Sequence, residues 1–278
     1  MEKCIFFGGS KYVIPLLEEL KRKFEIELVI TTEKESGAVP KFCEENSLHY
    51  LSIQRFNKDH KSLIINHKSK VAVLADFGLI LLKDILNSFE FGILNIHPSL
   101  LPKYRGPTPG QTAILNGDKS TGVSLIKLDD KVDHGDVLIQ TKEEVRASDT
   151  AQSLYERLFE IGSNLLDQNI KQYIKGDLKI TEQDHKKASF TKILRKNDGY
   201  FDLGNPPSLG KLDLMTRAYY PWPGTWTKIR IMNKELRIKF LPEKKVQVEG
   251  KKPVSYKDFI NGYPQTKEIT ELLRRLEA

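Results

Sequence analysis

The first 175 residues alternate short apolar runs with longer amphipathic stretches, and this alternation limits the fold more than any other feature of the sequence. Lys3–Phe7 is an apolar run typical of a buried strand. It is followed by Tyr12–Lys23, where apolar side chains recur every three or four residues, as they do on one face of a helix. The pattern continues to Ser148–Lys175, a long amphipathic stretch. Such alternation favours an α/β fold with a doubly wound, mostly parallel sheet.

The expected elements fall into two groups along the chain. The first group has strands at 3–7, 27–31, 70–74, 92–96, 121–127 and 137–145, and helices at 12–23, 39–46, 61–67, 82–88, 109–116 and 148–175. After a boundary at 176–187 and an extended linker at 188–202, the second group has a helix at 208–219, strands at 225–231, 236–241 and 246–248, a turn at 232–235, and a closing helix at 266–277. We therefore expect a large domain at 1–185 and a small one at 186–278.

The formal net charge of +7 is unevenly distributed between these two parts. Residues 186–278 contain 20 Lys and Arg against 10 Asp and Glu, whereas residues 1–185 contain 24 against 27. A strongly basic second part indicates a polyanionic partner. The alternative is that these lysines serve only solubility.

Cysteine and histidine usage excludes several classes of protein. Cys4 and Cys43 have neither disulfide-framework nor metal-ligand spacing, which favours a reducing cytoplasm. The histidines form no metal-ligand pattern, so we expect no metal. The first apolar run is too short for a signal peptide or a membrane span. We therefore expect a cytoplasmic, unprocessed protein with no membrane association.

Three polar residues, Asn95, His97 and Asp133, lie at a strand end and on a later loop, where side chains can take part in catalysis. Asn95 and His97 end an apolar run, and alternation places their side chains on the same side of the expected strand. Asp133 lies on a later loop rich in turn-forming residues. An amide, an imidazole and a carboxylate can together bind a developing oxyanion and transfer protons. Taken singly, each residue is also compatible with a structural role.

The residues around this trio resemble the signature of the folate-dependent formyltransferases. The match runs through His97–Gly106, Asn116–Asp118, Thr121–Val123 and Asp133 with Gly135, in order and in spacing. The resemblance implies a Rossmann-like formyltransferase fold and direct transfer of a formyl group from 10-formyltetrahydrofolate to an amine, without a metal. It also implies catalytic roles for Asn95, His97 and Asp133. Asn95 and His97 would bind the oxyanion, and Asp133 would orient His97 or a water molecule.

The same resemblance implies a folate pocket beside the trio. Its apolar side chains would enclose the pterin ring while backbone groups bind the ring's edge. The alternative is that Phe77, Leu79 and Leu81 are ordinary core residues. The residues expected to contact folate are Phe77, Leu79, Ile80, Leu81, Ser99, Leu100, Leu101, Pro102 and Val132.

Within the family, the chain is most similar to the methionyl-tRNA formyltransferases. The similarity implies initiator methionyl-tRNA as the acceptor, and we expect a monomer. It covers Ile5–Ser10, Val13–Leu17, Ser189–Ile193, Asp198–Gly199, Arg217–Gly224, Val248–Pro253 and Asp258–Gly262. Two departures concern the tRNA. The loop at 31–37 lacks the long basic insertion of those enzymes, and the C-terminal domain is a reduced OB-like β domain. The alternatives are an N-formyltransferase acting on a nucleotide-linked amino sugar and a non-catalytic RNA-binding protein.

Overall fold

The computed structural model describes residues 1–231 and 234–277, which form two compact units. Each unit combines segments that are distant in sequence. The first unit consists of Met1–Pro109, Ser120–Glu144 and Tyr155–Thr191, and the second of Gly110–Lys119, Val145–Leu154 and Lys192–Ala278.

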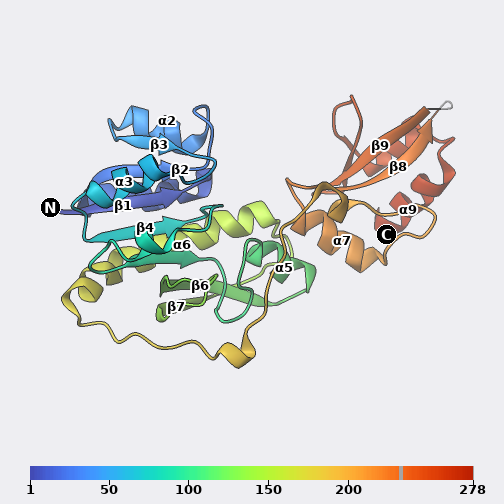
Figure 1. The fold of residues 1–278 in the computed structure, drawn as a ribbon. Helices are drawn as coiled ribbons and strands as arrows, with labels where there is room; N and C mark the ends of the chain where they lie inside the picture. Colours follow the sequence, from blue (N-terminus) through green and yellow to red (C-terminus); the bar gives the residue numbers. More distant parts are fainter. Residues whose placement is uncertain (232–233, 278) are drawn as a thin grey trace. The chain divides into compact units, whose positions relative to one another are not determined.

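The first unit contains a seven-stranded sheet of order β3-β2-β1-β4-β5-β6-β7 (Figure 1). Strands β1 to β5 are parallel, and β6 and β7 continue the sheet in antiparallel fashion. The fold class predicted from the alternation is therefore confirmed. The strands are β1 Glu2–Gly8, β2 Phe24–Thr31, β3 Tyr50–Ser52, β4 Val71–Ala75, β5 Ile93–His97, β6 Ser120–Lys127 and β7 Val137–Glu144.

Helices connect these strands. The longest, α6, begins after a reciprocal pair of hydrogen bonds between Thr150 and Ser153, in which each hydroxyl accepts the other residue's backbone N–H. This cap matches the helix-start signal expected near Ser148. The helices are η1 Lys11–Val13, α1 Ile14–Lys23, α2 Ala38–Glu45, α3 Lys58–Asn66, α4 Lys83–Leu86, α5 Pro109–Leu115 and α6 Ala151–Lys175, followed by the 3-10 turns η2 His185–Lys187 and η3 Lys196–Gly199.

Both faces of the parallel strands are buried, as a sheet with helices on both sides requires. Ile5, Phe7 and Ile93 belong to one buried cluster, which also includes Ile64 of α3 and Ile85 of α4. On the other face α6 approaches β5 closely. A Cβ built on Gly162 would lie 2.4 Å from Cγ2 of Ile96, so only glycine permits this approach. The strand that carries Asn95 and His97 is therefore fixed from both sides.

The order of the strands reverses between β1 and β4. The chain first builds outward from β1 to β3 and then returns to add β4 and β5 on the other side of β1. In open α/β sheets, ligands bind outside the carboxyl ends of the strands at such a reversal. The strand β5 ends at His97, one strand away from this point.

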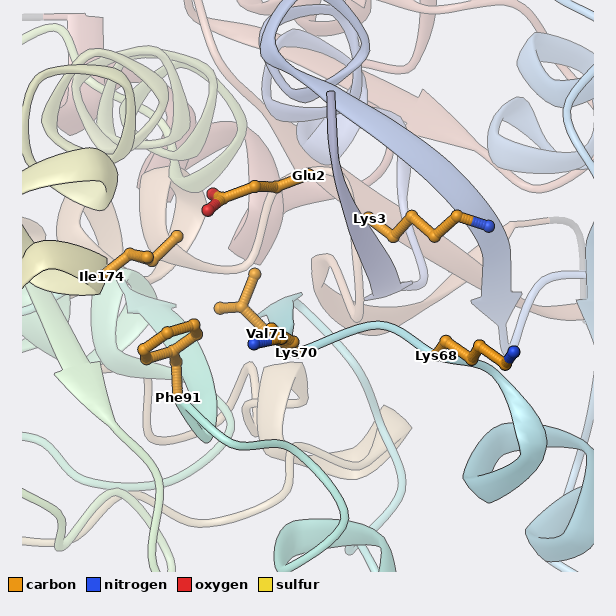
Figure 2. Close-up of a pocket in the computed structure, with 7 residues that line it drawn as sticks. All are labelled: Glu2, Lys3, Lys68, Lys70, Val71, Phe91 and Ile174. Carbon is orange, nitrogen blue, oxygen red and sulfur yellow. The ribbon is translucent and has the colours of Figure 1, made fainter.

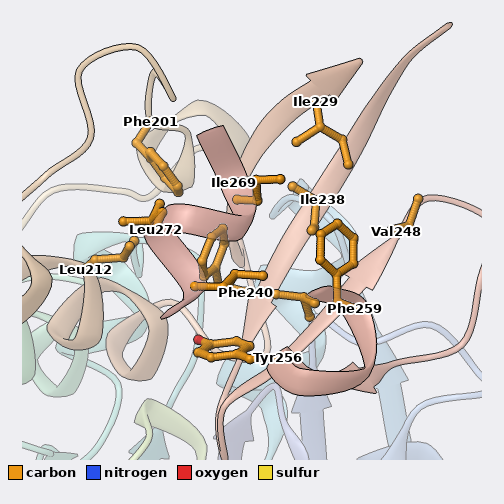
Figure 3. Packing of buried hydrophobic residues seen from close by; sticks show 12 residues of the cluster. Phe201, Leu212, Ile229, Ile238, Phe240, Val248, Tyr256, Phe259, Ile269 and Leu272 are labelled. Atoms are coloured by element: carbon orange, nitrogen blue, oxygen red, sulfur yellow. The ribbon is translucent and has the colours of Figure 1, made fainter. Parts of the chain in front are cut away.

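The second unit contains a four-stranded antiparallel sheet of order β11-β10-β9-β8. Figure 3 shows its core, in which Phe240 and Ile238 of β9 pack with Phe259 and Ile269 of two helices. One face of this sheet is thus covered by helices. The elements are α7 Leu209–Ala218, β8 Thr225–Ile231, β9 Lys234–Leu241, β10 Lys245–Val248, β11 Val254–Ser255, α8 Tyr256–Gly262 and α9 Lys267–Glu277.

A few expected elements differ from the structure. The short strands β3 and β11 and the helix α8 were not expected, because two or three residues give no readable period and α8 lies in a polar stretch. The turn expected at 232–235 is wrong for Lys234 and Glu235, which begin β9, and its first two residues lie outside the described part of the chain.

Candidate active site

Asn95 and His97 lie at the carboxyl end of β5 and are buried, with 5% and 4% of their surface exposed. Asp133 reaches them from the loop between β6 and β7, where its backbone is left-handed, with φ of +48°. The loop turns tightly at Gly135, where a Cβ would lie 1.8 Å from the carbonyl oxygen of Lys127. The structure thus brings together the three residues that the sequence predicted to be catalytic.

Asp133 lies at the centre of the trio. Its Oδ1 atom is 3.3 Å from Asn95 Nδ2, which donates to it, and 3.6 Å from His97 Nδ1. Its Oδ2 atom accepts a hydrogen bond of 2.7 Å from the backbone N–H of Gly106. The carboxylate is therefore held by two donors while its Oδ1 atom faces the imidazole.

The hydrogen bond of Nε2 defines the tautomer of the neutral His97 ring. Nε2 lies 2.9 Å from the carbonyl oxygen of Tyr104, which can only accept, so Nε2 carries a hydrogen. In the neutral ring, Nδ1 then has a free lone pair that faces Asp133 Oδ1. The imidazole therefore presents Nδ1 to the carboxylate and Nε2 to the Tyr104 carbonyl.

The loop after β5 is fixed by side-chain hydrogen bonds. The Ser124 hydroxyl donates to the carbonyl oxygen of Ser99 at 2.6 Å and accepts from the backbone N–H of Leu101 at 3.0 Å. Gln140 also donates to Ser124 and to the Leu101 carbonyl oxygen, both at 2.8 Å. Ser99 and Leu101 are buried, whereas Leu100 and Pro102 are half-buried. Any contact of this loop with folate would thus involve mainly Leu100, Pro102 and the backbone.

The other residues expected to bind folate differ in exposure. Phe77, Leu79 and Leu81 are half-buried and pack against the core cluster of the sheet, and the Phe77 ring lies edge-on to Phe7 at 5.4 Å. Ile80 is 80% exposed. Val132, beside Asp133, is 51% exposed. Of these five side chains, Ile80 and Val132 therefore expose apolar surface, and the other three contribute to the core.

Asp76 lies in the segment Ala75–Leu81 that the resemblance assigns to the pterin pocket, although its side chain was not among the expected folate contacts. It follows β4, and because Ala75 pairs with Ile96, Asp76 is level with His97 on the adjacent strand. Desolvation raises the pKa of the Asp76 carboxyl, and this effect is opposed by a hydrogen bond from Ser10. A charged residue directly after a buried strand was the signal that could have identified it.

A surface pocket of about 250 Å³ lies elsewhere on the first unit (Figure 2). Its walls come from Glu2 and Val71, which begin β1 and β4, and from Phe91 and Ile174. Since β1 and β4 are parallel, these residues mark the amino edge of the sheet, whereas Asn95 and His97 lie toward the carboxyl edge. The pocket is therefore separate from the trio.

Within residues 1–231 and 234–277, no three His, Cys, Asp or Glu side chains are grouped so that they could hold a metal ion. No helix in the same ranges is both long enough and apolar enough to cross a membrane.

The first unit thus has a doubly wound sheet with an amide, an imidazole and a carboxylate at its carboxyl edge, a set of groups that can stabilise an oxyanion. Residues 21–170, more than half of the chain, match the family described as "Formyl transferase". The chain therefore belongs to the formyl transferase family.

The relatives of the chain are methionyl-tRNA formyltransferases. That of Chloroflexus aurantiacus is 44% identical over 158 residues, which cover 57% of this chain and 50% of that protein. The chain thus spans about half the length of the relatives that it matches first. That of Carboxydothermus hydrogenoformans is 31% identical over 94% of this chain and 86% of its own length. The predicted similarity to these enzymes is confirmed.

A solved structure has the same fold. The N-formyltransferase of Helicobacter canadensis, in complex with folinic acid and dTDP-3-aminofucose, aligns with a TM-score of 0.64 at 17% identity. The alignment covers 89% of this chain and 95% of that one. At this identity the similarity concerns the fold alone.

Proposed function

We propose that this protein transfers the formyl group of 10-formyltetrahydrofolate to the α-amino group of initiator methionyl-tRNA. The observation that supports it most is the hydrogen-bonded cluster at the carboxyl edge of the sheet, where Asn95 and His97 are buried and Asp133 is half-buried. The family match and the methionyl-tRNA formyltransferases among the relatives support the reaction and the acceptor.

The trio supplies the proton transfers of this reaction. The neutral amine attacks the formyl carbon, and the carbonyl oxygen becomes negative as the new C–N bond forms. His97, protonated at Nδ1, would donate to that oxygen, because its Nε2 hydrogen is already bound by Tyr104. The Asn95 amide would be the second donor. Asp133 would stabilise the imidazolium and help a proton to pass from the attacking nitrogen to the departing folate nitrogen.

We assign the donor to the surface beside this trio. Ile80 and Val132 present exposed apolar side chains from the two loops that flank it, as a flat aromatic ring would require. The crystal structure from Helicobacter canadensis contains folinic acid, a folate, which supports a folate donor for this fold. Leu100 and Pro102 would contribute the neighbouring wall, and the half-buried Phe77, Leu79 and Leu81 would support its backbone.

The acceptor would be held by the outer face of the second unit's sheet. Along β8 the buried side chains alternate with accessible ones, so one face packs on the helices and the other faces solvent. The outward side chains are mainly basic. They are Trp226, Lys228 and Arg230 on β8, and Glu235, Arg237 and Lys239 on β9.

The pairing of β8 with β9 places these side chains in rows. Trp226 is opposite Lys239, and Lys228 is opposite Arg237. The Trp226 ring is also flanked by Tyr200, with ring centroids 4.8 Å apart, and by the Arg237 guanidinium at 5.7 Å. Cationic side chains neutralise phosphates, and exposed aromatic rings stack on unpaired bases. This combination supports an RNA acceptor more strongly than charge alone.

One observation favours a second candidate, a nucleotide-linked amino sugar as the acceptor. The similar fold from Helicobacter canadensis contains such a sugar nucleotide. In addition, β2 ends at Thr31 and α2 begins at Ala38, so the loop between them is short and carries one lysine, Lys34. A non-catalytic RNA-binding role is disfavoured, because it gives no use to the clustering of Asn95, His97 and Asp133.

A single experiment distinguishes these functions. The protein is incubated with 10-formyltetrahydrofolate and either methionyl-tRNA or a nucleotide-linked amino sugar, and the formylated product is identified by mass spectrometry. We expect formylmethionyl-tRNA with the wild type and none above background with His97→Ala. Formylation of the sugar nucleotide alone would show that the acceptor is the amino sugar and not methionyl-tRNA. Formylation of neither would disprove the proposed activity.

A further inference from the structure

A segment after α6, residues 181–191, runs behind the trio and contacts both loops that hold it. At one end, Thr181 and Val137 exchange two backbone hydrogen bonds of 2.8 Å, next to the Asp133 loop. At the other end, the carbonyl of Ser189 accepts from the N–H of Arg105, and the N–H of Thr191 donates to the carbonyl of Arg105, both at 2.8 Å. The segment therefore joins the loop after β5 to the loop after β6.

Gln183 lies in the middle of this segment and is 5% exposed. Its Nε2 atom donates to the carbonyl oxygens of Asp133 and Gly135, at 2.9 and 2.7 Å. Its Oε1 atom accepts from Arg105 Nε and Nη2, at 3.2 and 2.7 Å. A carboxamide has two N–H donors and one oxygen with two lone pairs. Every hydrogen-bonding position of the side chain is therefore used, half on each loop.

The two loops joined in this way hold the trio directly. Gly106, next to Arg105, donates to Asp133 Oδ2, and Tyr104, on the other side of Arg105, accepts from His97 Nε2. Asp133 itself has a left-handed backbone, which is unfavourable for a residue with a side chain unless its surroundings hold it. The two hydrogen bonds that Gln183 donates hold this backbone at the carbonyl oxygens of Asp133 and Gly135.

We infer that Gln183 is a positioning residue for formyl transfer, which acts through Asp133. This inference rests on the proposed function. By fixing the carbonyl groups on either side of His134, the carboxamide sets the position of the Asp133 carboxylate relative to His97 Nδ1. The chemistry depends on that distance, because misplacement of a catalytic group by about 1 Å costs roughly 100-fold in rate.

The alternative is that Gln183 has a purely structural role, as a hydrogen-bond acceptor for the Arg105 guanidinium. This guanidinium is buried, and desolvation lowers its pKa, so it requires acceptors. Gln183 Oε1 and His185 Nδ1, which is 2.8 Å from Arg105 Nη2, provide them. If this were the whole function of Gln183, any acceptor at position 183 would be sufficient.

Two substitutions separate these roles. Gln183→Glu keeps an acceptor for Arg105 but turns a carboxylate oxygen toward two carbonyl oxygens, so it loses the donors to the Asp133 loop. Gln183→Met keeps the volume and loses all four bonds. We expect both variants to lower kcat by about 10- to 100-fold at saturating donor and acceptor, with both KM values within about threefold of the wild type. Glu182→Gln, on the exposed neighbour, should leave kcat unchanged.

Hydrogen exchange at the Gly106 amide provides a readout that needs no turnover. That N–H donates to Asp133 Oδ2, so displacement of Asp133 should speed its exchange at least tenfold in both Gln183 variants and leave it unchanged in Glu182→Gln. Wild-type activity in Gln183→Glu, or an effect on KM alone, would overturn the inference. Unchanged exchange at the Gly106 amide in the Gln183 variants would also overturn the inference. This readout does not depend on formyl transfer, so a wild type without activity would refute the proposed function but not this inference.

Discussion

The two sheets of the molecule present their polar side chains in opposite ways. At the carboxyl edge of the first sheet, Asn95 and His97 are almost completely buried and each has a defined partner. On the outer face of the second sheet, Lys228 and Arg230 are exposed, and the ion pairs there, such as Lys228 with Glu235 at 2.7 Å, lie at the surface.

This difference shows how one protein can separate catalysis from the binding of a large acceptor. Burial with fixed partners strengthens electrostatic interactions and orients the reacting groups, which is what chemistry requires. Exposure leaves cations free to exchange counterions for phosphates, which is what binding of a long polyanion requires. Substitutions in the first region should therefore change kcat, and substitutions in the second should change KM for the acceptor.

The largest effect is expected from His97→Ala. Loss of the imidazole removes the group that we propose as a donor to the oxyanion, so we expect kcat to fall by about 10²- to 10⁴-fold. The measurement is the rate of formyl transfer at saturating donor and acceptor. His49→Ala, at an exposed histidine of the same unit, serves as the control and should retain the wild-type rate. Retention of near-normal transfer by His97→Ala would show that the trio is not catalytic.

Next in size is the effect of Phe259→Ala on the second unit. Phe259 is fully buried in the core that covers the inner face of the second sheet (Figure 3). We expect its truncation to lower the free energy of unfolding of that unit by about 3–5 kcal/mol, whereas Lys228→Ala on the outer face should cost less than about 0.5 kcal/mol. Denaturant titration measures both. Equal effects of the two substitutions would mean that the outer face is not a free surface.

A smaller effect is expected from charge reversal on that outer face. The double variant Arg230→Glu with Lys239→Glu should raise KM for methionyl-tRNA about tenfold at 0.1 M salt, because it removes two cations that can neutralise phosphates. The value of kcat should stay within about twofold. Lys58→Glu, in α3 of the first unit, is the matched control. An equal rise in KM in Lys58→Glu would mean that the outer face of the second sheet is not the specific binding surface for methionyl-tRNA.

The smallest effect concerns the amino edge of the first sheet. The pKa of Glu27 is lowered: desolvation raises it, but hydrogen bonds from Lys3 and Ser69 outweigh that effect. A depressed carboxyl pKa contributes stability above the unfolded pKa, and this contribution is lost as the pH falls through the folded pKa. Glu27→Gln should therefore cost up to about 1 kcal/mol at pH 7 and nothing at pH 2. A difference that persisted at pH 2 would contradict the assigned cause.

Much of the first unit could be predicted from the sequence because its strands and helices are periodic. The runs near Lys3–Phe7 and Gly92–Ile96 are strands within one or two residues of their expected ends. The short strand β3 and the helix α8 could not be predicted, since pairing with a neighbour and packing on a core define them rather than local pattern. The segments that each unit combines were also unpredictable, because they depend on contacts between distant residues.

The clustering of Asn95, His97 and Asp133 was predictable from the sequence, whereas the hydrogen bonds that hold the three residues were not. Alternation placed Asn95 and His97 on one side of a strand, and the family signature added Asp133. Nothing in the sequence indicated that His97 Nε2 would lie 2.9 Å from the Tyr104 carbonyl oxygen, which leaves Nδ1 for the oxyanion contact that we propose. Gln183 also gave no signal, because a lone glutamine in a polar stretch has no period, and its role depends on four bonds to distant loops.

The separation of chemistry and acceptor binding is tested most directly by the salt dependence of the wild-type reaction. Steady-state formyl transfer to methionyl-tRNA is measured from 50 to 200 mM salt at saturating formyl donor. We predict that KM for methionyl-tRNA rises by about 10- to 100-fold, linearly on a logarithmic plot, while kcat stays constant. A KM that does not change with salt, or a kcat that falls together with it, would contradict the account.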